Sequence, residues 1–298
     1  MEHVERAGVH SGDSMAIYPA LNLSSREVET IVDYTTRIGL ALEVKGLMNV
    51  QFAVQGNDIY VLEVNPRASR TVPFVSKAIG HSIAKIAARC MAGVKLADQG
   101  FTAEVLPSQF CVKEAVFPFN KFLGVDPILS PEMKSTGEVM GVADNFPEAY
   151  FKAVIGAGER PPFEGTVFVS VKDADKDGIV PVVDRLLKAD FKVIATKGTY
   201  EFLKSKGHDV TRIHKVKEGR PHIVDAVKNG EVSLLINTTE GEQAILDSAE
   251  IRRAALQNKV CYTTTLAGAD ALTSAIVKVK GVESSVPVVR LQGELHKG

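Results

Sequence analysis

The sequence predicts an α/β protein of two domains: an α+β domain with a largely antiparallel sheet, then a domain with a doubly wound parallel sheet. The length of 298 residues suits about two domains. Residues 47–65 carry the pattern of a β-hairpin, whose strands are antiparallel. From residue 166 onward, short buried strands alternate with amphipathic helices, which is typical of a parallel sheet with helices on both faces. We expect the domains to cover residues 1–157 and 158–298.

The first expected element is a helix over residues 24–46. Ser24 and Glu27 have the spacing of a capping box, apolar residues recur at helical intervals, and Gly46 is the expected end of the helix. Next in the first domain we expect the hairpin, a helix over residues 73–92, a strand over 108–119 and a helix that opens at Asn145.

The expected hairpin consists of two β-rich runs, residues 47–54 and 59–65, joined by a loop at Gly56, Asn57 and Asp58. Counting back from this loop pairs Gln51 with Glu63, Asn49 with Asn65 and Ala53 with Val61. Because opposed residues share a face, one face is polar at its open end. The opposite face is expected to pack on a core and comprises Val50, Phe52, Val54, Tyr60, Leu62 and Val64.

Residues 156–165 form the expected linker, since they are rich in Gly, Pro and charge. After it we expect strands at 166–171, 192–196, 233–239 and 259–265. The intervening helices are expected at 176–187, 200–206, 221–228, 249–257 and 266–279.

Composition excludes several classes of protein. The net charge of −1 provides no basic field for nucleic acid and no polybasic patch for a membrane surface. No apolar run approaches the ~20 residues that span a bilayer, and the N-terminal residues lack a signal-peptide core. Three widely spaced cysteines indicate buried thiols in a reducing compartment, so we expect a cytoplasmic protein.

The polar face of the hairpin is the first candidate for chemistry. Gln51, Glu63 and Asn65 bring one carboxylate and two amides to a strand end, and these are oxygen ligands suited to Mg²⁺ beside a phosphate. Arg67 and Arg70 follow directly and can clamp phosphate oxygens. The alternative is a sheet edge with a surface ion pair, but three convergent oxygen ligands followed by two arginines favour a metal-phosphate site.

Two further segments suggest anion binding. The loop "GVHSGDS" at residues 8–14 offers backbone donors, although an ordinary polar loop is the simpler interpretation. Thr196–Thr199 and Asn237–Thr239 each lie between a strand and a helix, with Lys176 and Lys215 available. These turns are either simple helix caps or a phosphate pocket.

Several strings together resemble the large subunit of carbamoyl-phosphate synthase. The strings are "GVHSGDS", "GLMNVQFAV", "EVNPRASRTVPFVSKA", "FPFNKF", "STGEVMG", "EGRPHIVDAVKNGE" and "INTTEG", and they cover essentially the whole chain. The resemblance implies the later half of the second ATP-grasp unit, followed by a methylglyoxal-synthase-like regulatory domain. Met1 matches an internal position of the family, so we expect a split subunit or a truncated chain that is inactive alone because half of the ATP-grasp clamp is absent.

The resemblance also implies roles for residues. Arg67 and Arg70 stabilise the transferring phosphoryl group, while Gln51, Glu63 and Asn65 hold Mg²⁺ or Mn²⁺. The expected nucleotide contacts are Gly8, Val9, His10, Ser11, Gln51 and Glu63. The expected site for the activator ornithine comprises Glu5, Asp13, Glu114, Tyr262 and Thr264. The expected pocket for UMP or IMP comprises Ser170, Lys176, Thr196, Thr199, Lys215, Asn237 and Thr239.

The implied enzyme uses ATP to make carbamoyl phosphate from bicarbonate and glutamine-derived ammonia, for arginine and pyrimidine biosynthesis. The implied partners are the remainder of the large subunit and a glutaminase small subunit, and we expect a homo-oligomer. Glu242 and Gln243 stand where relatives carry basic residues, and Phe117 stands where an aliphatic residue is common. Two alternatives are a stand-alone regulatory module and a methylglyoxal-synthase-like lyase, for which only Glu240 and Glu242 offer a base near the pocket.

Overall fold

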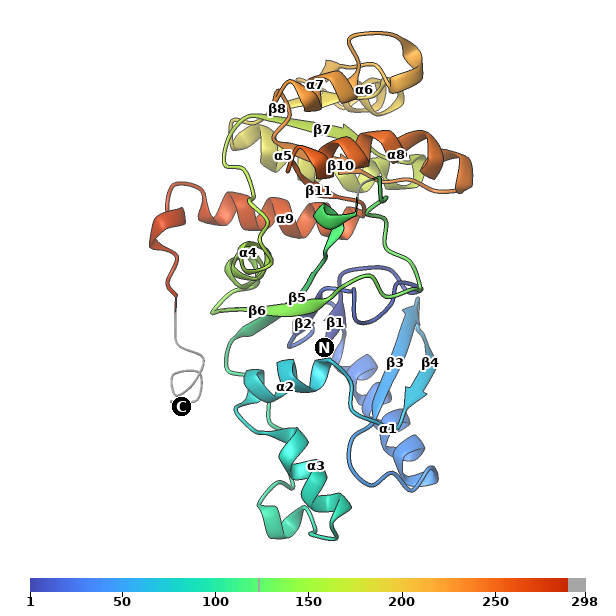
Figure 1. Ribbon diagram of the computed structural model, residues 1–298, viewed down its shortest axis with the longest axis vertical. Helices are drawn as coiled ribbons and strands as arrows, with labels where there is room; N and C mark the ends of the chain where they lie inside the picture. The colour runs from blue at the N-terminus through green and yellow to red at the C-terminus, as the bar shows by residue number, and fades with distance from the viewer. Residues whose placement is uncertain (123, 289–298) are drawn as a thin grey trace. The chain divides into compact units, whose positions relative to one another are not determined.

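The computed structural model of the chain describes residues 1–122 and 124–288 (Figure 1). It divides into two units: the first holds Met1–His3 and Ala16–Cys111, and the second holds Val4–Met15 and Val112–Val286. Within the described residues, no helix has both the length and the apolar character needed to cross a membrane.

The first unit contains four strands and three α-helices among its described residues. They are β1 (Glu2–His3), β2 (Ala16–Tyr18), α1 (Ser25–Ala41), β3 (Asn49–Gln55), β4 (Asp58–Asn65), α2 (Thr71–Ile79) and α3 (Ile83–Met91). Strands β1 and β2 pair in antiparallel fashion, as do β3 and β4, which confirms the expected antiparallel character of this part.

Helix α1 begins where the sequence predicts and ends early. Ser24 accepts a hydrogen bond from the Glu27 amide and the Glu27 carboxylate accepts from the Ser24 amide, so the capping box is confirmed. The prediction that the helix continues to Gly46 is wrong. It ends at Ala41, because Glu43 already has a φ of 49°, which an α-helix cannot include.

The helix predicted over residues 73–92 is in fact two helices. Gly80 closes α2 with a φ of 71°, and α3 starts after Ser82. Glycine adopts this left-handed conformation without strain and commonly ends a helix in this way. An apolar stripe that runs through both segments conceals the break.

The β3–β4 register agrees with the prediction at the open end of the hairpin only. Gln51 pairs with Glu63 and Asn49 with Asn65, as expected, and a bulge follows between Gln51 and Phe52. Ala53 therefore pairs with Tyr60 instead of Val61, and the turn has two residues instead of three. A bulge adds one residue to one strand, which moves every later side chain of that strand to the other face.

This bulge also corrects the predicted apolar face. Tyr60 joins the face of Gln51, and Val61 takes its place beside Phe52. Tyr60 is 49% exposed and Leu62 is 48% exposed, so the expectation that these two pack on a core within the described chain is wrong.

Most of β5 (Phe110–Val116) belongs to the second unit, which begins at Val112 in this part of the chain. Further elements of this unit are β6 (Gly137–Ala143), α4 (Phe146–Gly156), β7 (Thr166–Ser170), α5 (Lys176–Lys188), β8 (Lys192–Ala195), α6 (Lys197–Ser205), β9 (Thr211–Arg212), α7 (Ile223–Lys228), β10 (Leu234–Asn237), α8 (Glu242–Gln257), β11 (Cys261–Thr263) and α9 (Leu266–Val279). Asn145 caps α4 as predicted: its side-chain oxygen accepts a hydrogen bond from the Glu148 amide.

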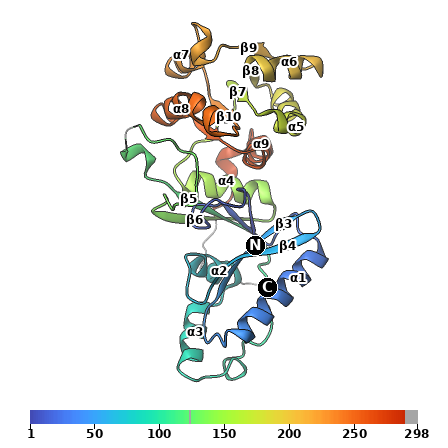
Figure 2. The ribbon, with the colours of Figure 1, turned by 90° about the vertical axis from the view of Figure 1, so that its right-hand side faces the viewer.

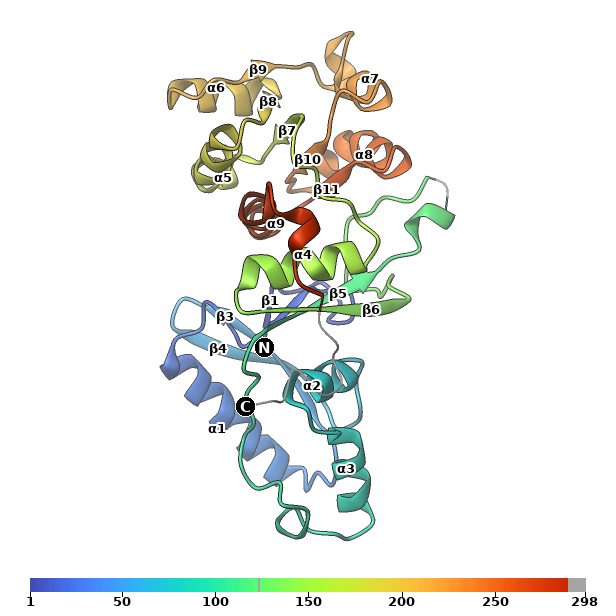
Figure 3. The same cartoon turned by 90° about the vertical axis from the view of Figure 1, so that its left-hand side faces the viewer.

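The doubly wound parallel sheet is confirmed. Five strands lie in the order β11-β10-β7-β8-β9, and each neighbouring pair is parallel. Figures 2 and 3 show α5, α6 and α9 on one side of this sheet and α7 and α8 on the other. Phe168 and Leu235 from the sheet join a buried apolar cluster with α7 and α8, so this face is sealed from water.

Candidate functional site

The polar hairpin face lies in the first unit, and its side chains contact each other. The Asn65 amide donates to Glu63 Oε1 at 2.9 Å, and Arg67 Nη2 donates to Asn65 Oδ1 at 3.3 Å. Glu63 is exposed and is the cross-strand partner of Gln51. Asn65 Oδ1 keeps a second lone pair for a cation, and the Arg67 guanidinium beside it has further N–H donors for a phosphate.

The donor set suits a hard cation that shares its ligands with a phosphate. Residues 1–122 and 124–288 contain no group of three or more His, Cys, Asp or Glu side chains that could hold a metal ion. One carboxylate with two amides is a sparse site, and Mg²⁺ tolerates such a site when substrate phosphates complete its coordination. Helix α2 starts directly after Arg70, and a helix N-terminus adds a favourable dipole for an anion.

The loop of residues 8–14 lies in the second unit and is folded around His10. His10 Nδ1 accepts from the Gly12 amide at 3.0 Å, and the His10 carbonyl accepts from the amides of Asp13 and Ser14. Lys113 of β5, which is 0% exposed, donates to the carbonyls of Ser11 and Gly12. The buried Lys113 ammonium thus fixes the backbone of this loop.

Glu5 and Glu114 form the centre of an acidic site in the second unit. Glu5 accepts from the Met15 amide at 2.6 Å, while Glu114 Oε2 is buried without a hydrogen-bond partner. Burial raises the pKa of Glu5 to about 7. Burial, and then repulsion from Glu5, raise the pKa of Glu114 well above its usual value. A buried carboxyl group without a hydrogen-bond partner lowers the stability of the folded chain, and a cationic ligand that pairs with it would offset this penalty.

The other predicted activator residues differ in environment. The Asp13 carboxylate is already engaged, since it accepts from the Lys134 amide at 2.7 Å and from the Ser135 amide and hydroxyl at 3.0 and 2.5 Å. Tyr262 of β11 is half-buried, and burial and then repulsion from Glu159 raise its pKa. Thr264 follows the same strand and is half-buried. Their contacts with an activator stay predictions.

Sequence reasoning missed Glu159. It lies in the expected linker, where charge is ordinary, and much of its side chain is exposed. Burial of its carboxyl group nevertheless raises its pKa, and its charge acts on Glu114, Cys261 and Tyr262. The charges of Glu159 and Glu114 thus repel each other. No local pattern identifies Glu159, because only the fold brings residue 159 near β5 and β11.

The two threonine turns converge at the ends of β7, β8 and β10. Ser170, Thr196, Thr199 and Asn237 are all buried. The Thr196 hydroxyl donates to Ser170 Oγ at 3.0 Å, and the Asn237 amide donates to the Ser170 carbonyl at 3.3 Å. Parallel strands present their carboxyl ends at one edge, where α/β sheets bind ligands.

Helices α6 and α8 begin earlier than predicted, which changes these turns. Thr196 is the N-cap residue of α6, so Thr199 lies in the first helical turn, and Gly241 precedes α8 with a φ of 82°. Lys176 approaches the N-terminus of α6, since a Cβ added at Gly198 would lie 3.7 Å from its Nζ.

Two other predicted residues, Thr239 and Lys215, are less buried than the residues at this edge. Thr239, just after the turn, is half-buried. Lys215 is exposed, and its amide donates to Glu218. Lys172, which was not predicted, also lies here. Its backbone amide donates a hydrogen bond to Thr238 Oγ1, and its ammonium donates to the Glu240 carboxylate at 2.8 Å.

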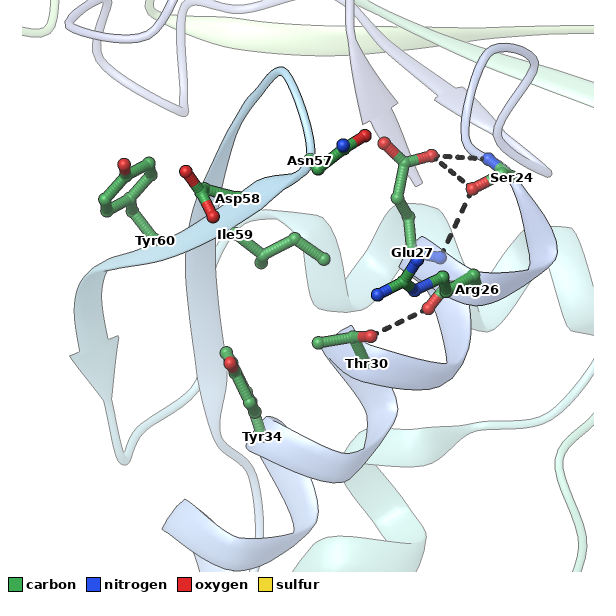
Figure 4. A pocket seen from close by; sticks show the side chains of 9 residues that line it. All are labelled: Ser24, Arg26, Glu27, Thr30, Tyr34, Asn57, Asp58, Ile59 and Tyr60. Atoms are coloured by element: carbon green, nitrogen blue, oxygen red, sulfur yellow. Dashed lines mark hydrogen bonds between the residues drawn. The ribbon is translucent and has the colours of Figure 1, made fainter.

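A separate hollow of about 450 Å³ lies in the first unit between α1 and the hairpin turn (Figure 4). Arg26, Thr30 and Tyr34 of α1 line it together with residues 57–60 of the hairpin, of which Ile59 extends toward α1. No residue predicted to bind ATP, metal or an effector is among the described residues that line this hollow.

Comparison with known proteins identifies both parts of the chain. Residues 1–99 match the family described as "Carbamoyl-phosphate synthase L chain, ATP binding domain", and residues 178–264 match an "MGS-like domain". The carbamoyl phosphate synthase large chain of Pseudomonas aeruginosa is 56% identical over 298 residues, which is 100% of this chain and 27% of the relative. This chain is a homologue of the carbamoyl phosphate synthase large chain.

Other large chains agree. The Halomonas eurihalina protein is 55% identical over 301 residues, covering 100% of this chain and 28% of its own length. The Pasteurella multocida protein is 56% identical over 277 residues, covering 93% of this chain and 26% of its own length. The chain thus spans about a quarter of these relatives. Within it, the stretch similar to an ATP-binding domain precedes the stretch similar to an MGS-like domain.

The residues expected to differ from relatives lie at the start of α8 and just after β5. Glu242 and Gln243 are exposed in the first turn of α8, and Gln243 donates to Asp247 at 3.0 Å. A negative charge at a helix N-terminus competes with a bound anion. Phe117 stacks on Phe119 with ring centroids 4.8 Å apart, so the larger side chain is accommodated by an aromatic contact.

Proposed function

We propose that this chain supplies the carbamate-phosphorylating half and the allosteric part of an enzyme that makes carbamoyl phosphate from bicarbonate, ammonia and ATP. The ammonia derives from glutamine. The observation that carries this proposal is the polar hairpin face, which lies within the stretch matched to an ATP-binding domain. The proposed partners are the remainder of the large subunit, a glutaminase small subunit and further copies of the assembly, in the cytoplasm.

In this proposal Gln51, Glu63 and Asn65 hold Mg²⁺ or Mn²⁺, which supplies positive charge beside the ATP phosphates. Arg67, beside Asn65, neutralises the transferring phosphoryl group together with Arg70. Gly8, Val9, His10 and Ser11 contact the nucleotide through a loop whose shape Lys113 maintains. Phosphoryl transfer depends mainly on such positioning and electrostatic stabilisation.

We also propose that the edge formed by Ser170, Thr196, Thr199, Asn237 and Thr239 binds a nucleoside monophosphate, UMP or IMP. Lys176 and Lys215 supply the positive charge. The start of α6 orients free backbone N–H groups toward a phosphate, as helix N-termini do. Glu242 weakens this pocket relative to one with a basic residue there.

Replacing Lys176 with methionine is expected to lower the affinity of the chain for UMP and IMP by about 10- to 100-fold. A hydrogen bond to a charged group contributes about 1.5–3 kcal/mol, and Lys176 Nζ would lie 3.7 Å from a Cβ added at Gly198 in the first turn of α6. Isothermal titration calorimetry with each nucleotide measures the change. Lys188→Met, at the exposed end of the same helix, is the matched control. Equal affinities for K176M and K188M would contradict the assignment.

We further propose that Glu5, Asp13, Glu114, Tyr262 and Thr264 bind ornithine, with Glu159 as an additional carboxyl. A diamino acid brings positive charge to carboxyl groups whose raised pKa values reflect burial. In the ligand-free chain, the stability contributed by protonated Glu5 is complete below about pH 4.5 and declines as the pH rises toward 7. The cation is expected to reverse this loss.

Ornithine affinity is therefore expected to rise about tenfold between pH 6 and pH 8. Glu5 ionises across this range, with a pKa of about 7, while the ornithine side-chain ammonium keeps its charge. Glu5→Gln is expected to flatten the profile, and Glu164→Gln, an exposed acid in the linker, is expected to leave it unchanged. Calorimetric titrations at each pH test this. An affinity that stays constant with pH in the unmodified chain would contradict an ionisable cation site.

Use of the chain as a regulatory module alone needs no ATP chemistry and would show the same effector binding. The lyase alternative is not supported by the environment of its base. The hydrogen bond from Lys172 lowers the pKa of Glu240, which makes that carboxylate a weaker base, and Glu242 faces solvent at the start of α8.

A further inference from the structure

Arg252 of α8 is a completely buried arginine that joins three segments of the second unit. It is 0% exposed. Its Nε and Nη2 donate to the two carboxylate oxygens of Asp126 at 2.8 and 2.5 Å. Nη1 donates to Asn237 Oδ1 at 3.1 Å, and Nη2 also donates to the Ile245 carbonyl at 2.7 Å.

On one side, Arg252 supports the wall of the proposed nucleotide pocket. Its bond to Asn237 Oδ1 orients the amide so that Nδ2 donates to the Ser170 carbonyl. Both Asn237 and Ser170 are buried at the carboxyl edge of the parallel sheet. A ligand that shifts the end of β10 must therefore act on the guanidinium behind it.

On the other side, Asp126 belongs to the segment that holds the loop of residues 8–14. The Ser130 carbonyl accepts from the His10 amide at 2.9 Å. Lys134 gives its amide to the Asp13 carboxylate at 2.7 Å. The proposed ATP-contacting loop and the proposed nucleotide pocket are thus connected through residues 126–135 by hydrogen bonds within one unit.

We propose that Arg252 is a positioning residue that transmits occupancy of the nucleotide pocket to the loop of residues 8–14 through Asp126. This inference rests on the proposed nucleotide pocket. A buried bidentate ion pair has few alternative arrangements, because a separated guanidinium would remain desolvated and unpaired. The ends of β10 and the 126–135 segment therefore move together, and a contact network of this kind has discrete arrangements that a ligand can bias.

Hydrogen exchange of the whole chain, followed by mass spectrometry with and without saturating UMP or IMP, tests the coupling. In the unmodified chain, nucleotide is expected to change the exchange rates of residues 8–14 by about fivefold or more, the lower end of usual allosteric couplings. In Asp126→Asn, calorimetric affinity is expected to stay within about threefold while the exchange effect falls below about twofold. The side chain of Asp126 is 23% exposed, so this isosteric change is the milder one.

Arg252→Met and its exposed neighbour Arg253→Met form a matched pair. R253M is expected to couple as the unmodified chain does. R252M is expected to lose the coupling and, because it also loses the bond that orients Asn237, part of its nucleotide affinity. A D126N chain that retains the full exchange effect would overturn the proposal. Binding of UMP and IMP without any change at residues 8–14 in the unmodified chain would overturn the coupling alone. Absence of calorimetric binding would overturn the nucleotide pocket and the coupling with it.

Discussion

Replacing Gly141 with alanine is expected to lower the free energy of unfolding of the second unit by about 3 kcal/mol or more. Gly141 lies in β6, where α4 crosses it closely. An added Cβ would lie 2.0 Å from the Ala149 carbonyl oxygen and 2.5 Å from the Ala153 amide nitrogen. Both are backbone atoms of a helix, so no side-chain rotation relieves the overlap, and α4 must move away from the sheet.

Gly137, the first residue of β6, is the matched control. A Cβ there meets nothing within 4 Å, and its backbone needs no positive φ. Gly137→Ala is expected to change stability by less than about 1 kcal/mol. Urea unfolding followed by circular dichroism, with the slope compared between variants, measures both changes. Equal midpoints for the two variants would show that α4 does not pack on β6 as described.

Replacing Glu63 with glutamine is expected to reduce carbamate-dependent ADP formation by about 100-fold or more, in a large chain of full length that carries this sequence. The glutamine retains an acceptor for the Asn65 amide, so the local hydrogen bond survives while the carboxylate charge is lost. A hard cation loses most of its affinity for the site when its carboxylate becomes a neutral amide. The Mg²⁺ concentration needed for half-maximal rate is expected to rise together with the loss of rate.

Asp58→Asn serves as the control for Glu63→Gln, because Asp58 is an exposed acid in the same strand, at the hairpin turn. It is expected to leave both the rate and the Mg²⁺ dependence within about twofold, since exposed charges contribute little. A Glu63→Gln enzyme with normal Mg²⁺ dependence would remove this carboxylate from the metal site.

Local sequence patterns predicted the elements that depend on near neighbours. The Ser24–Glu27 capping box and the Asn145 cap each involve residues three apart, and both are present. The predicted pairing of Gln51 with Glu63 is present because the bulge after Gln51 compensates for a turn one residue shorter than expected. Where a local signal was absent, the prediction failed: the bulge after Gln51 inserts one residue without any characteristic sequence.

The residues of the candidate sites were predictable from the sequence, whereas their burial and contacts were not. Alternation along one strand predicts that Glu63 and Asn65 share a face, and the pairing of the two strands adds Gln51 to it. The resemblance to large chains supplied Glu5, Glu114 and the threonine turns, but not their environments. Burial of Glu114 Oε2 without a partner follows from packing around β5, which no short pattern contains.

The sequence by itself determined the family, the antiparallel hairpin and the parallel sheet of this chain, because motifs, short turns and alternating patterns act over a few residues. Only the tertiary structure decided which polar groups lose their water. Arg252 and Asp126 are 126 residues apart in the chain and form a buried ion pair. The charge of Glu159, in the expected linker, acts on Glu114. Desolvation depends on neighbours that folding brings together from distant positions, and it sets the pKa values and contacts on which regulation depends.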